Sequence, residues 1–312
     1  MKPTEICAVV VTHNPDRDLD QRLRATSEQV GHIIVVDNAS DATHASALPR
    51  IFEELANAEL VSLDSNTGLA AAQNAGIMRA IGLGYPWTLL LDQDSIPGPD
   101  MIGKMAEVYE GQPVSQRVAI IAPNITDPET DAIARFLRPR GGLLFQRPSC
   151  RGRQIDNVTI VIASGALVSN EIYRKLGPFR EDYFIDYVDT EFCLRVVSNG
   201  YQIVVACKAV LSHKLGSPKL RRLGPFRLYP RFHSPARWYY IARNRVPTIA
   251  RYGLRMPHWL FFELMASGYH FLRMLALEDR RFEKVGAYVA GTIDGIRGKM
   301  GPLPKQRASR WN

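Results

Sequence analysis

Apolar runs and helical stretches alternate along the first hundred residues. A continuous apolar run is typical of a strand that is buried on both faces of a sheet, and one occurs at residues 6–11. Mostly apolar segments at residues 33–36, 60–63 and 87–91 are predicted as further strands. Stretches of helical character lie between them, at residues 18–29, 43–56 and 69–81. Strands and helices that alternate at this spacing form right-handed crossover units, so the pattern predicts a doubly wound, parallel α/β sheet.

The pattern is less regular after residue 118. We predict further strands at residues 119–122, 158–163, 203–206 and 210–212, and helices at 190–198, 236–252, 258–277 and 282–296. Residues 123–155 are rich in Pro, Gly and Arg, which indicates a hairpin or loop insertion. Residues 214–230 are interpreted as a mobile loop, and residues 301–312 as a disordered basic tail.

Charge is distributed unevenly along the 312 residues. The net charge is +8, but residues 1–191 carry 17 basic and 26 acidic side chains, a balance of −9. Residues 192–262 carry 13 basic side chains and no acidic one, and residues 263–312 carry 9 and 5. A carboxylate-free stretch of this length favours an anionic partner, which is a phosphate group, a nucleic acid or an acidic membrane surface.

Composition excludes several protein classes. The 46% hydrophobic and 22% charged fractions are those of a globular protein, not of a disordered one. Cys7, Cys150, Cys193 and Cys207 lack metal-ligand or scaffold spacing, and we interpret Cys7 and Cys207 as buried thiols in a reducing compartment. The apolar run at 6–11 is too short for a signal peptide, and no stretch reaches the roughly 18 apolar residues of a membrane span.

Each of the first four predicted strands ends in a polar cluster. These clusters are Thr12-His13-Asn14, Asp37-Asn38, Asp64-Ser65-Asn66-Thr67-Gly68 and Asp92-Gln93-Asp94. In an open parallel sheet, ligands bind at the carboxyl ends of the strands. Any single cluster is also explained by helix capping or turn formation, but four on one edge favour a binding site.

The chemistry of these clusters fits a nucleoside diphosphate with a divalent cation. The carboxylate of Asp37 suits the N–H group of a uracil or thymine ring. Asn66, Gly68 and the amino end of the following helix offer N–H groups to a diphosphate. Asp92 and Asp94, two residues apart beside Gln93, form a hard-oxygen pair for Mg²⁺ or Mn²⁺. We assign Thr12, Asn14 and Gln93 to the same nucleotide site.

The motifs resemble glycosyltransferase family 2. The resemblance rests on residues 11–14, 36–40, 66–68, 74–76 and 92–95. Within the family, Asp-Gln-Asp-Ser at 92–95 and the segments 186–191 and 237–244 are similar to bacterial rhamnosyltransferases. The resemblance implies a GT-A fold of the α/β class, with a mostly parallel, Rossmann-like sheet flanked by helices and a C-terminal helical extension. Residues 1–213 would be the catalytic domain, with a nucleotide-sugar half at about 1–95 and an acceptor half at about 96–213, and residues 214–300 the extension.

The resemblance also implies an activity. It is the inverting, metal-dependent transfer of L-rhamnose from dTDP-L-rhamnose to a hydroxyl of a bacterial cell-surface glycan or its lipid-linked precursor. Asp37 would bind the base, Asp92 would lie near the ribose and metal, and Asp94 and His213 would ligate the metal. A UDP-sugar, such as UDP-N-acetylglucosamine or UDP-galactose, is the alternative donor.

Asp189 takes the place of the family's general base, ahead of Asp186 and Glu191. The carboxylates of this segment open a predicted helix, so simple N-capping is an alternative. Asp186 is assigned to the acceptor or the donor sugar. Gly165 lacks a side chain and would let a sugar approach the backbone, although a tight turn explains this glycine equally well.

The basic residues after His213 are expected to close over the donor. Arg side chains match phosphate oxygens in two-pronged fashion, and among Arg221, Arg222, Arg227, Arg231, Arg237 and Arg243 we choose Arg243, with Asn244, for the leaving diphosphate. The Gln-x-x-Arg-Trp motif of many family-2 enzymes is missing, which argues against a processive synthase.

The helix at 259–277 has a polar stripe on a mostly apolar surface. It suits either packing on protein, including a second subunit, or peripheral binding to an anionic membrane. We therefore expect a cytoplasmic protein at the inner face of the bacterial membrane, with dimerisation left open. A nucleic-acid-binding protein is the non-enzyme alternative, but the acidic strand ends would repel a polyanion, so no nucleic acid is expected.

Overall fold

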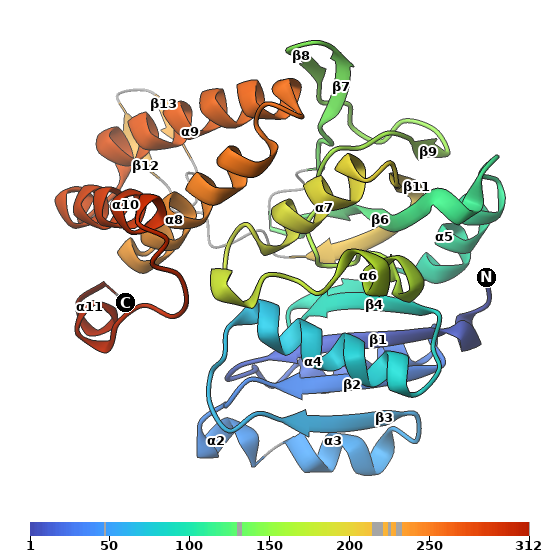
Figure 1. Cartoon of the computed structure of the whole chain (residues 1–312). Coiled ribbons are helices and arrows are strands. Elements are labelled where there is room, and N and C mark those ends of the chain that lie inside the picture. Colours follow the sequence, from blue (N-terminus) through green and yellow to red (C-terminus); the bar gives the residue numbers. More distant parts are fainter. Residues whose placement is uncertain (47, 130–132, 214–220, 224–225, 229–232, 312) are drawn as a thin grey trace. The chain divides into compact units, whose positions relative to one another are not determined.

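The computed structural model of the chain consists of two compact units (Figure 1). It describes residues 1–312 except 47, 130–132, 214–220, 224–225, 229–232 and 312. Unit 1 comprises residues 1–138, 146–181 and 188–213, and unit 2 comprises 139–145, 182–187 and 214–312. The main boundary falls after His213, but two short segments before it, 139–145 and 182–187, belong to unit 2.

Unit 1 is built on a nine-stranded mixed sheet with the order β3-β2-β1-β4-β10-β6-β11-β5, in which β9 pairs with β11. The strands are β1 (Ile6–Thr12), β2 (His32–Asp37), β3 (Ala58–Ser62), β4 (Trp87–Asp92), β5 (Ser95–Pro97), β6 (Val118–Thr126), β9 (Gln154–Ile155), β10 (Leu167–Ser169) and β11 (Gln202–His213). Strands β1 to β4 are mutually parallel, as predicted, and all of β1 is buried.

The helices of unit 1 connect these strands. They are α1 (Leu19–Ser27), α2 (Ala42–Ala45), α3 (Leu48–Glu54), α4 (Leu69–Gly82), α5 (Met101–Glu110), α6 (Asn170–Leu176) and α7 (Val188–Ser198), with 3-10 turns at Pro3–Glu5, Ser115–Arg117 and Glu181–Tyr183. The helix predicted at 43–56 is two helices. Helix α4 packs on β1 and β2 through its small residues: a Cβ at Gly76 would lie 2.3 Å from the Val9 side chain.

The strand predicted at 158–163 is wrong. Of this apolar run only Ile160 forms a bridge, to Leu137, and the strand of this region is β10, which runs antiparallel to β4 and β6. An apolar run without regular periodicity is expected to be buried, but it can be either a strand or irregular backbone in the core. The strands predicted at 203–206 and 210–212 are one strand, β11, with a register shift between Ala206 and Val210.

Unit 2 is mainly helical. Its helices are α8 (Pro235–Tyr252), α9 (Pro257–Leu277), α10 (Arg281–Ile296) and α11 (Lys305–Trp311), and its hairpins are β7 (Arg138–Gly141) with β8 (Leu144–Gln146) and β12 (Arg221–Leu223) with β13 (Phe226–Leu228). Glycines let α8 and α10 approach closely, because a Cβ at Gly291 or Gly295 would lie 2.2 or 2.5 Å from a backbone oxygen of α8.

Two predictions concern the C-terminal part of the chain, a disordered tail at 301–312 and a loop at 214–230. The predicted disordered tail instead contains α11, because Trp311 is buried and packs on the ring of Tyr239 in a cluster with Leu303. Most of the loop predicted at 214–230 lies outside the described residues, apart from the backbone of β12 and β13. None of the helices in the described part of the chain is long and apolar enough to cross a membrane.

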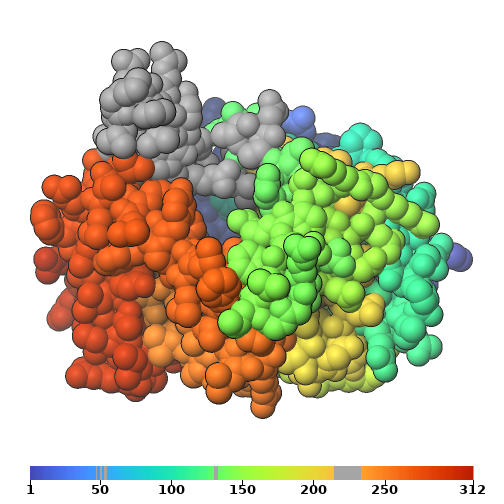
Figure 2. Space-filling model, turned by 90° about the horizontal axis from the view of Figure 1, so that it is seen from above, coloured from blue at the N-terminus to red at the C-terminus, as the bar shows by residue number. Residues whose placement is uncertain are grey.

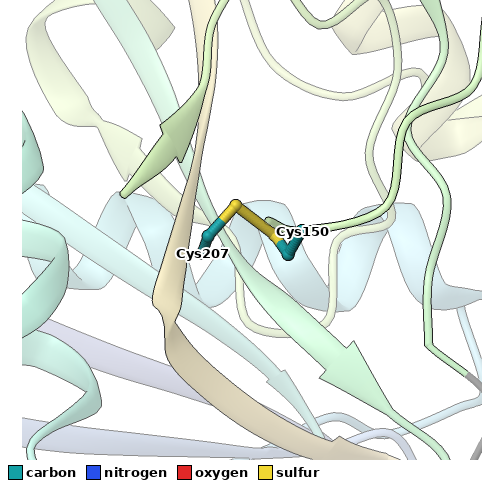
Figure 3. The surroundings of a disulfide bond; sticks show 2 residues. All are labelled: Cys150 and Cys207. Atoms are coloured by element: carbon teal, nitrogen blue, oxygen red, sulfur yellow. A yellow bond between two sulfur atoms is a disulfide. The ribbon is translucent and has the colours of Figure 1, made fainter. Parts of the chain in front are cut away.

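Two cysteines are joined in a disulfide. Cys207 of β11 is bonded to Cys150 of the segment that follows β8, with the two Cα atoms 5.1 Å apart (Figure 3). The interpretation of Cys207 as a free buried thiol is therefore wrong, because a spacing of 57 residues carries no signal for pairing. Cys7 is a free, buried thiol, as predicted, and so is Cys193.

Candidate active site

Two aspartates and a histidine form one group at the carboxyl end of β4. Asp92 ends β4 and Asp94 follows it, while His213 ends β11. The antiparallel pairing of β11 with β5 sets His213 opposite Ser95, the neighbour of Asp94. One ligand atom of each of the three residues lies within 4.8 Å of the others. The sheet register therefore assembles the group that the sequence predicted from residues 121 positions apart.

The charges of the group stabilise one another. His213 Nδ1 lies 3.3 Å from Asp94 Oδ1, and His213 Nε2 lies 3.7 Å from Asp92 Oδ2. Burial alone would raise the pKa of Asp94, but the hydrogen bond and charge of His213, with the charge of Arg22, lower it below its ordinary value. Burial would lower the pKa of His213, but its bond to Asp94 and the charges of the nearby aspartates raise it.

Two buried serines orient His213. The hydroxyl of Ser95 lies 3.1 Å from His213 Nδ1 and is also hydrogen-bonded to the hydroxyl of Ser164. Carboxylate oxygens and an imidazole nitrogen are ligands that Mn²⁺ accepts, and a carboxylate pair also suits Mg²⁺. The donor set, its partial exposure and its hydrogen-bonded support therefore fit a divalent cation.

Asp37 lies at the parallel strand end two strands away from β4. It is 4% exposed, and it accepts hydrogen bonds from Thr12 Oγ1 at 3.2 Å and from the backbone N–H and hydroxyl of Ser40. The register places Thr12 opposite Asp37 on neighbouring strands. These contacts hold the Asp37 carboxylate in one orientation. A carboxylate that recognises one edge of a base must be held in this way.

The other predicted nucleotide residues line the same edge through backbone contacts. Asn14, which has a left-handed backbone with φ 50°, accepts from the N–H of Asp41. The Asn66 side chain accepts from Asn38 Nδ2 and from the N–H of Gly68, the N-cap of α4. Gln93 Oε1 accepts from the N–H of His13 at 2.8 Å. The structure thus links the strand-end clusters into one hydrogen-bonded rim.

Arg22 is a residue of this site that the sequence analysis missed. It lies on α1, is 8% exposed, and its guanidinium donates to Asp16 at 2.6 and 3.0 Å and to the backbone oxygen of Gln93 at 3.0 Å. Its hydrogen bond to Asp16 raises its pKa, and the charge of Asp94 adds to the effect. Arg22 thereby fixes the turn in which Gln93 lies between Asp92 and Asp94. A single Arg on a polar helix gives no sequence signal for this role.

Asp189 opens α7 in unit 1. Its Oδ1 accepts from the N–H of Thr190 at 2.7 Å. It borders a pocket that is otherwise apolar, lined by Leu90, Ile120, Val161, Ile162, Ala163, Ala166, Val168, Phe179, Phe192 and Cys193. Leu90 precedes Asp92 by two residues, and Ala163 is next to Ser164. The lining of the pocket therefore includes sequence neighbours of Asp92 and of Ser164. Glu191, the alternative base, is 1% exposed and paired with Arg195 at 2.5 Å.

Asp186 and Arg243 belong to unit 2. Asp186 forms a two-pronged pair with Arg237 at 2.6 and 2.7 Å, and its role toward a sugar stays a prediction. Arg243 is 1% exposed and donates to backbone oxygens of Asp182 and Tyr183. This burial does not support the predicted contact of Arg243 with a diphosphate, because its guanidinium is occupied in holding the segment 182–187. The side chains of Arg221, Arg222, Arg227 and Arg231 lie outside the described part.

Gly165 is explained by backbone geometry. Its φ is +81°, and a Cβ there would lie 2.6 Å from Pro123 and 2.8 Å from Leu211. A left-handed backbone and this close packing both favour glycine. A sugar contact is therefore not needed to account for the residue, and it stays a prediction.

The fold is the GT-A fold of glycosyltransferases, as predicted. A mannosyltransferase of Pyrobaculum calidifontis, solved with GDP-mannose and Mn²⁺, superimposes with a TM-score of 0.59 at 16% identity, covering 96% of this chain and 88% of that one. S. aureus TarS 1–349 gives 0.58 at 14% identity, over 95% and 81%. These neighbours share the fold of this chain, and the sheet with its strand-end carboxylates agrees with it.

The sequence gives the family. The profile of glycosyl transferase family 2 matches residues 7–177, and the chain belongs to this family. It is 28% identical over 301 residues to the dTDP-rhamnosyl transferase RfbF of Shigella flexneri, covering 96% of this chain and 97% of the relative. It is 26% identical over 293 residues to the galactofuranosyltransferase GlfT1 of Mycolicibacterium smegmatis, covering 87% and 91%.

Proposed function

We propose that the chain transfers L-rhamnose from dTDP-L-rhamnose to a hydroxyl group of a bacterial cell-surface glycan or of its lipid-linked precursor, with inversion. The observation that carries the proposal is the Asp92–Asp94–His213 group on the same sheet edge as Asp37. A divalent cation, Mg²⁺ or Mn²⁺, held by this group would neutralise charge on the donor diphosphate. The near full-length similarity to RfbF supports the rhamnosyl donor.

The binding roles follow from the hydrogen-bonded rim. Asp37 accepts the N–H of the thymine ring, while Thr12 and Ser40 keep its carboxylate in position. Asn14, Asn66, Gly68, Asp92 and Gln93 surround the ribose and diphosphate. The amino end of α4, which begins after Gly68, contributes its unpaired N–H groups.

Asp189 acts as the general base. Its carboxylate takes the proton of the acceptor hydroxyl while that oxygen bonds to the anomeric carbon. The bond from the anomeric carbon to the diphosphate oxygen breaks, and its electron pair leaves with dTDP. Gly165 and Asp186 are assigned to the sugars.

We place the reaction at the inner face of the cytoplasmic membrane. The support is the carboxylate-free basic stretch at 192–262, which fits anionic lipid as well as a lipid-linked acceptor. The chain is then a peripheral membrane protein.

A panel of nucleotide sugars tests the donor. With Mn²⁺ present, dTDP-L-rhamnose should give hydrolysis or transfer and should raise the melting temperature, and both effects should disappear with EDTA or in Asp94→Asn. The alternative donor is a UDP-sugar, because the fold neighbour TarS has been solved with UDP. Turnover and stabilisation by a UDP-sugar, with neither from dTDP-L-rhamnose, would overturn the rhamnosyl assignment.

A further inference from the structure

Helix α9 packs on unit 2 with its polar stripe inward. Glu263 is 8% exposed and accepts hydrogen bonds from Tyr187, from Arg245 at 3.1 Å and from Ser267 at 2.8 Å. Trp259 and Met274, on the same side of the helix, are fully buried. Three of the four polar residues that made this helix ambiguous in sequence, Glu263, Ser267 and Arg273, are therefore bound inside unit 2, whereas His270 is exposed.

The opposite side of α9 is apolar and exposed. We call it the outer stripe, and it consists of Phe261 (42% exposed), Leu264 (56%), Met265 (54%), Tyr269 (64%), Leu272 (66%) and Leu275 (36%). Leu264 and Met265 are adjacent and the other spacings are three or four positions, which places all six residues on one face of a helix. A surface helix of a soluble domain normally has the reverse arrangement, with its apolar face in the core.

The β7–β8 hairpin extends this surface. Phe145 contacts the rings of Phe261 and Phe262 with centroids 6.2 and 5.4 Å apart, and Leu143 and Leu144 are 56% and 63% exposed. In Figure 2 the green hairpin lies against the orange surface of α9. Contiguous apolar surface of this kind marks an interaction site.

The positive charge of unit 2 favours an anionic partner for this surface. Unit 2 carries 21 basic and 7 acidic side chains, a balance of +14, whereas the rest of the chain has 18 and 24. A second copy docked through the outer stripe would bring two units of like charge together. An anionic bilayer supplies both hydrocarbon for the stripe and negative charge for its surroundings.

We infer that the outer stripe of α9, with the hairpin tip at Leu143 and Leu144, lies in the interface of an anionic lipid bilayer, with the helix axis parallel to the membrane. The inference deepens the membrane location proposed above and rests on it. It does not depend on the identity of the donor, which is read by residues of unit 1.

Vesicle co-sedimentation of the full chain tests the surface. The wild type should bind vesicles of equal parts phosphatidylglycerol and phosphatidylcholine, and bind phosphatidylcholine alone weakly. The double variant Leu264→Ser/Leu272→Ser should lose binding about tenfold or more. Met78→Ser is the matched control, because Met78 is 55% exposed on α4 of unit 1. Both variants should keep the wild-type melting temperature and donor hydrolysis.

Fluorescence of a polarity-sensitive label gives an independent readout. Gly268 lies within the outer stripe and Gly82 lies on α4, and at both a Cβ meets open space. A label on Gly268→Cys should shift to the blue with anionic vesicles, and one on Gly82→Cys should not.

Three results would overturn the inference. They are vesicle binding that the double variant keeps, equal binding to neutral vesicles, and a wild-type dimer in solution that the double variant dissociates. If dTDP-L-rhamnose fails in the donor panel but vesicle binding is retained, the donor assignment alone is overturned. If dTDP-L-rhamnose is turned over but vesicle binding fails, the role of the outer stripe alone is overturned.

Discussion

Asp94 Oδ1 lies 3.3 Å from His213 Nδ1, and a cation bound by both side chains would replace this direct contact. We expect Asp94→Asn to weaken dTDP binding about tenfold or more with Mn²⁺ present, because a ligand of the cation is lost. With EDTA the variant and the wild type should bind dTDP alike. Calorimetry in the two buffers measures this. Asp279→Asn, an exposed residue that follows α9 in unit 2, is the control, and equal loss in both buffers would point to a structural role for Asp94.

Asp189 borders the apolar pocket and is the assigned base. We expect Asp189→Asn to lower kcat about a hundredfold to ten-thousandfold while dTDP binding stays near the wild-type level, because proton transfer is removed and the nucleotide contacts are not. Steady-state kinetics with the preferred donor measures the effect. Asp186→Asn is compared alongside, and a larger loss of kcat in that variant would transfer the role of base to Asp186.

Arg22 holds the turn between the two aspartates through the carbonyl of Gln93. We expect Arg22→Gln to weaken Mn²⁺ binding and to lower kcat/KM about tenfold, since residues that orient a ligand matter nearly as much as the ligand. Manganese titration followed by electron paramagnetic resonance checks this. The control is Arg24→Gln on the same helix, where Arg24 is paired with Asp20. Equal Mn²⁺ affinity in the two variants would show that Arg22 does not support the metal site.

The difference between Arg22 and Asp94 shows what the sequence reveals of the site. A carboxylate directly after a buried strand is placed by the strand itself, so Asp37, Asp92 and Asp94 were predictable. Arg22 reaches Gln93 from a different element, 71 residues away, and only the packing of α1 decides that contact.

The elements were predictable where periodicity and connectivity agree. The alternation of buried runs and helices placed β1 to β4, and the long helices α8, α9 and α10 lie within a residue or so of their expected limits. Prediction failed at 158–163, where an apolar run packs in the core with a single bridge in place of a strand. It also failed at α11, where Trp311 and Leu303 pack in the core and Arg307 pairs with Asp294.

The Cys150–Cys207 disulfide links the insertion after β8 to β11, the strand that carries His213. Closing a loop of this length restricts the unfolded chain, so we expect reduction to lower the free energy of unfolding by about 2–4 kcal/mol. Urea unfolding with and without a phosphine reductant measures the difference. In the folded chain the free thiols should not attack the disulfide, because burial raises the pKa of Cys7 to about 12 and raises that of Cys193 as well.

The double variant Cys150→Ser/Cys207→Ser serves as the control for reduction. Its unfolding should be unaffected by the reductant and should match that of the reduced wild type. A wild type whose unfolding and intact mass are unchanged by reduction would contradict the disulfide.

At the scale of the whole molecule, the two units carry different candidate binding features. Unit 1 contains the acidic strand ends, and unit 2 contains most of the positive charge and the outer stripe. The segment 182–187 is part of unit 2 but leads directly into α7, where Asp189 lies. Three of its residues, Phe184, Asp186 and Tyr187, have left-handed backbones with φ of 63 to 65°, which non-glycine residues adopt only when their surroundings enforce it.

Asn244 of α8 is what enforces this conformation. It is fully buried, and its Nδ2 donates to the backbone oxygens of Tyr183, Ile185 and Asp186 at 2.9 to 3.0 Å. Asn244→Ala removes these buried hydrogen bonds, of which only the one to Tyr183 O has a replacement donor in Arg243, so we expect a loss of about 1–3 kcal/mol in the free energy of unfolding. We also expect a lower kcat with an unchanged KM for the donor, because the chain that enters α7 is released and Asp189 with it.

Asn170→Ala separates the two effects. Asn170 is also fully buried and hydrogen-bonded, to Thr88 and to the backbone oxygen of Tyr85, but it does not contact the segment 182–187. Both variants should lose similar stability in urea unfolding, and only Asn244→Ala should lose turnover at a temperature where both remain folded. If the two variants lose turnover equally, the loss follows general destabilisation and unit 2 does not position Asp189.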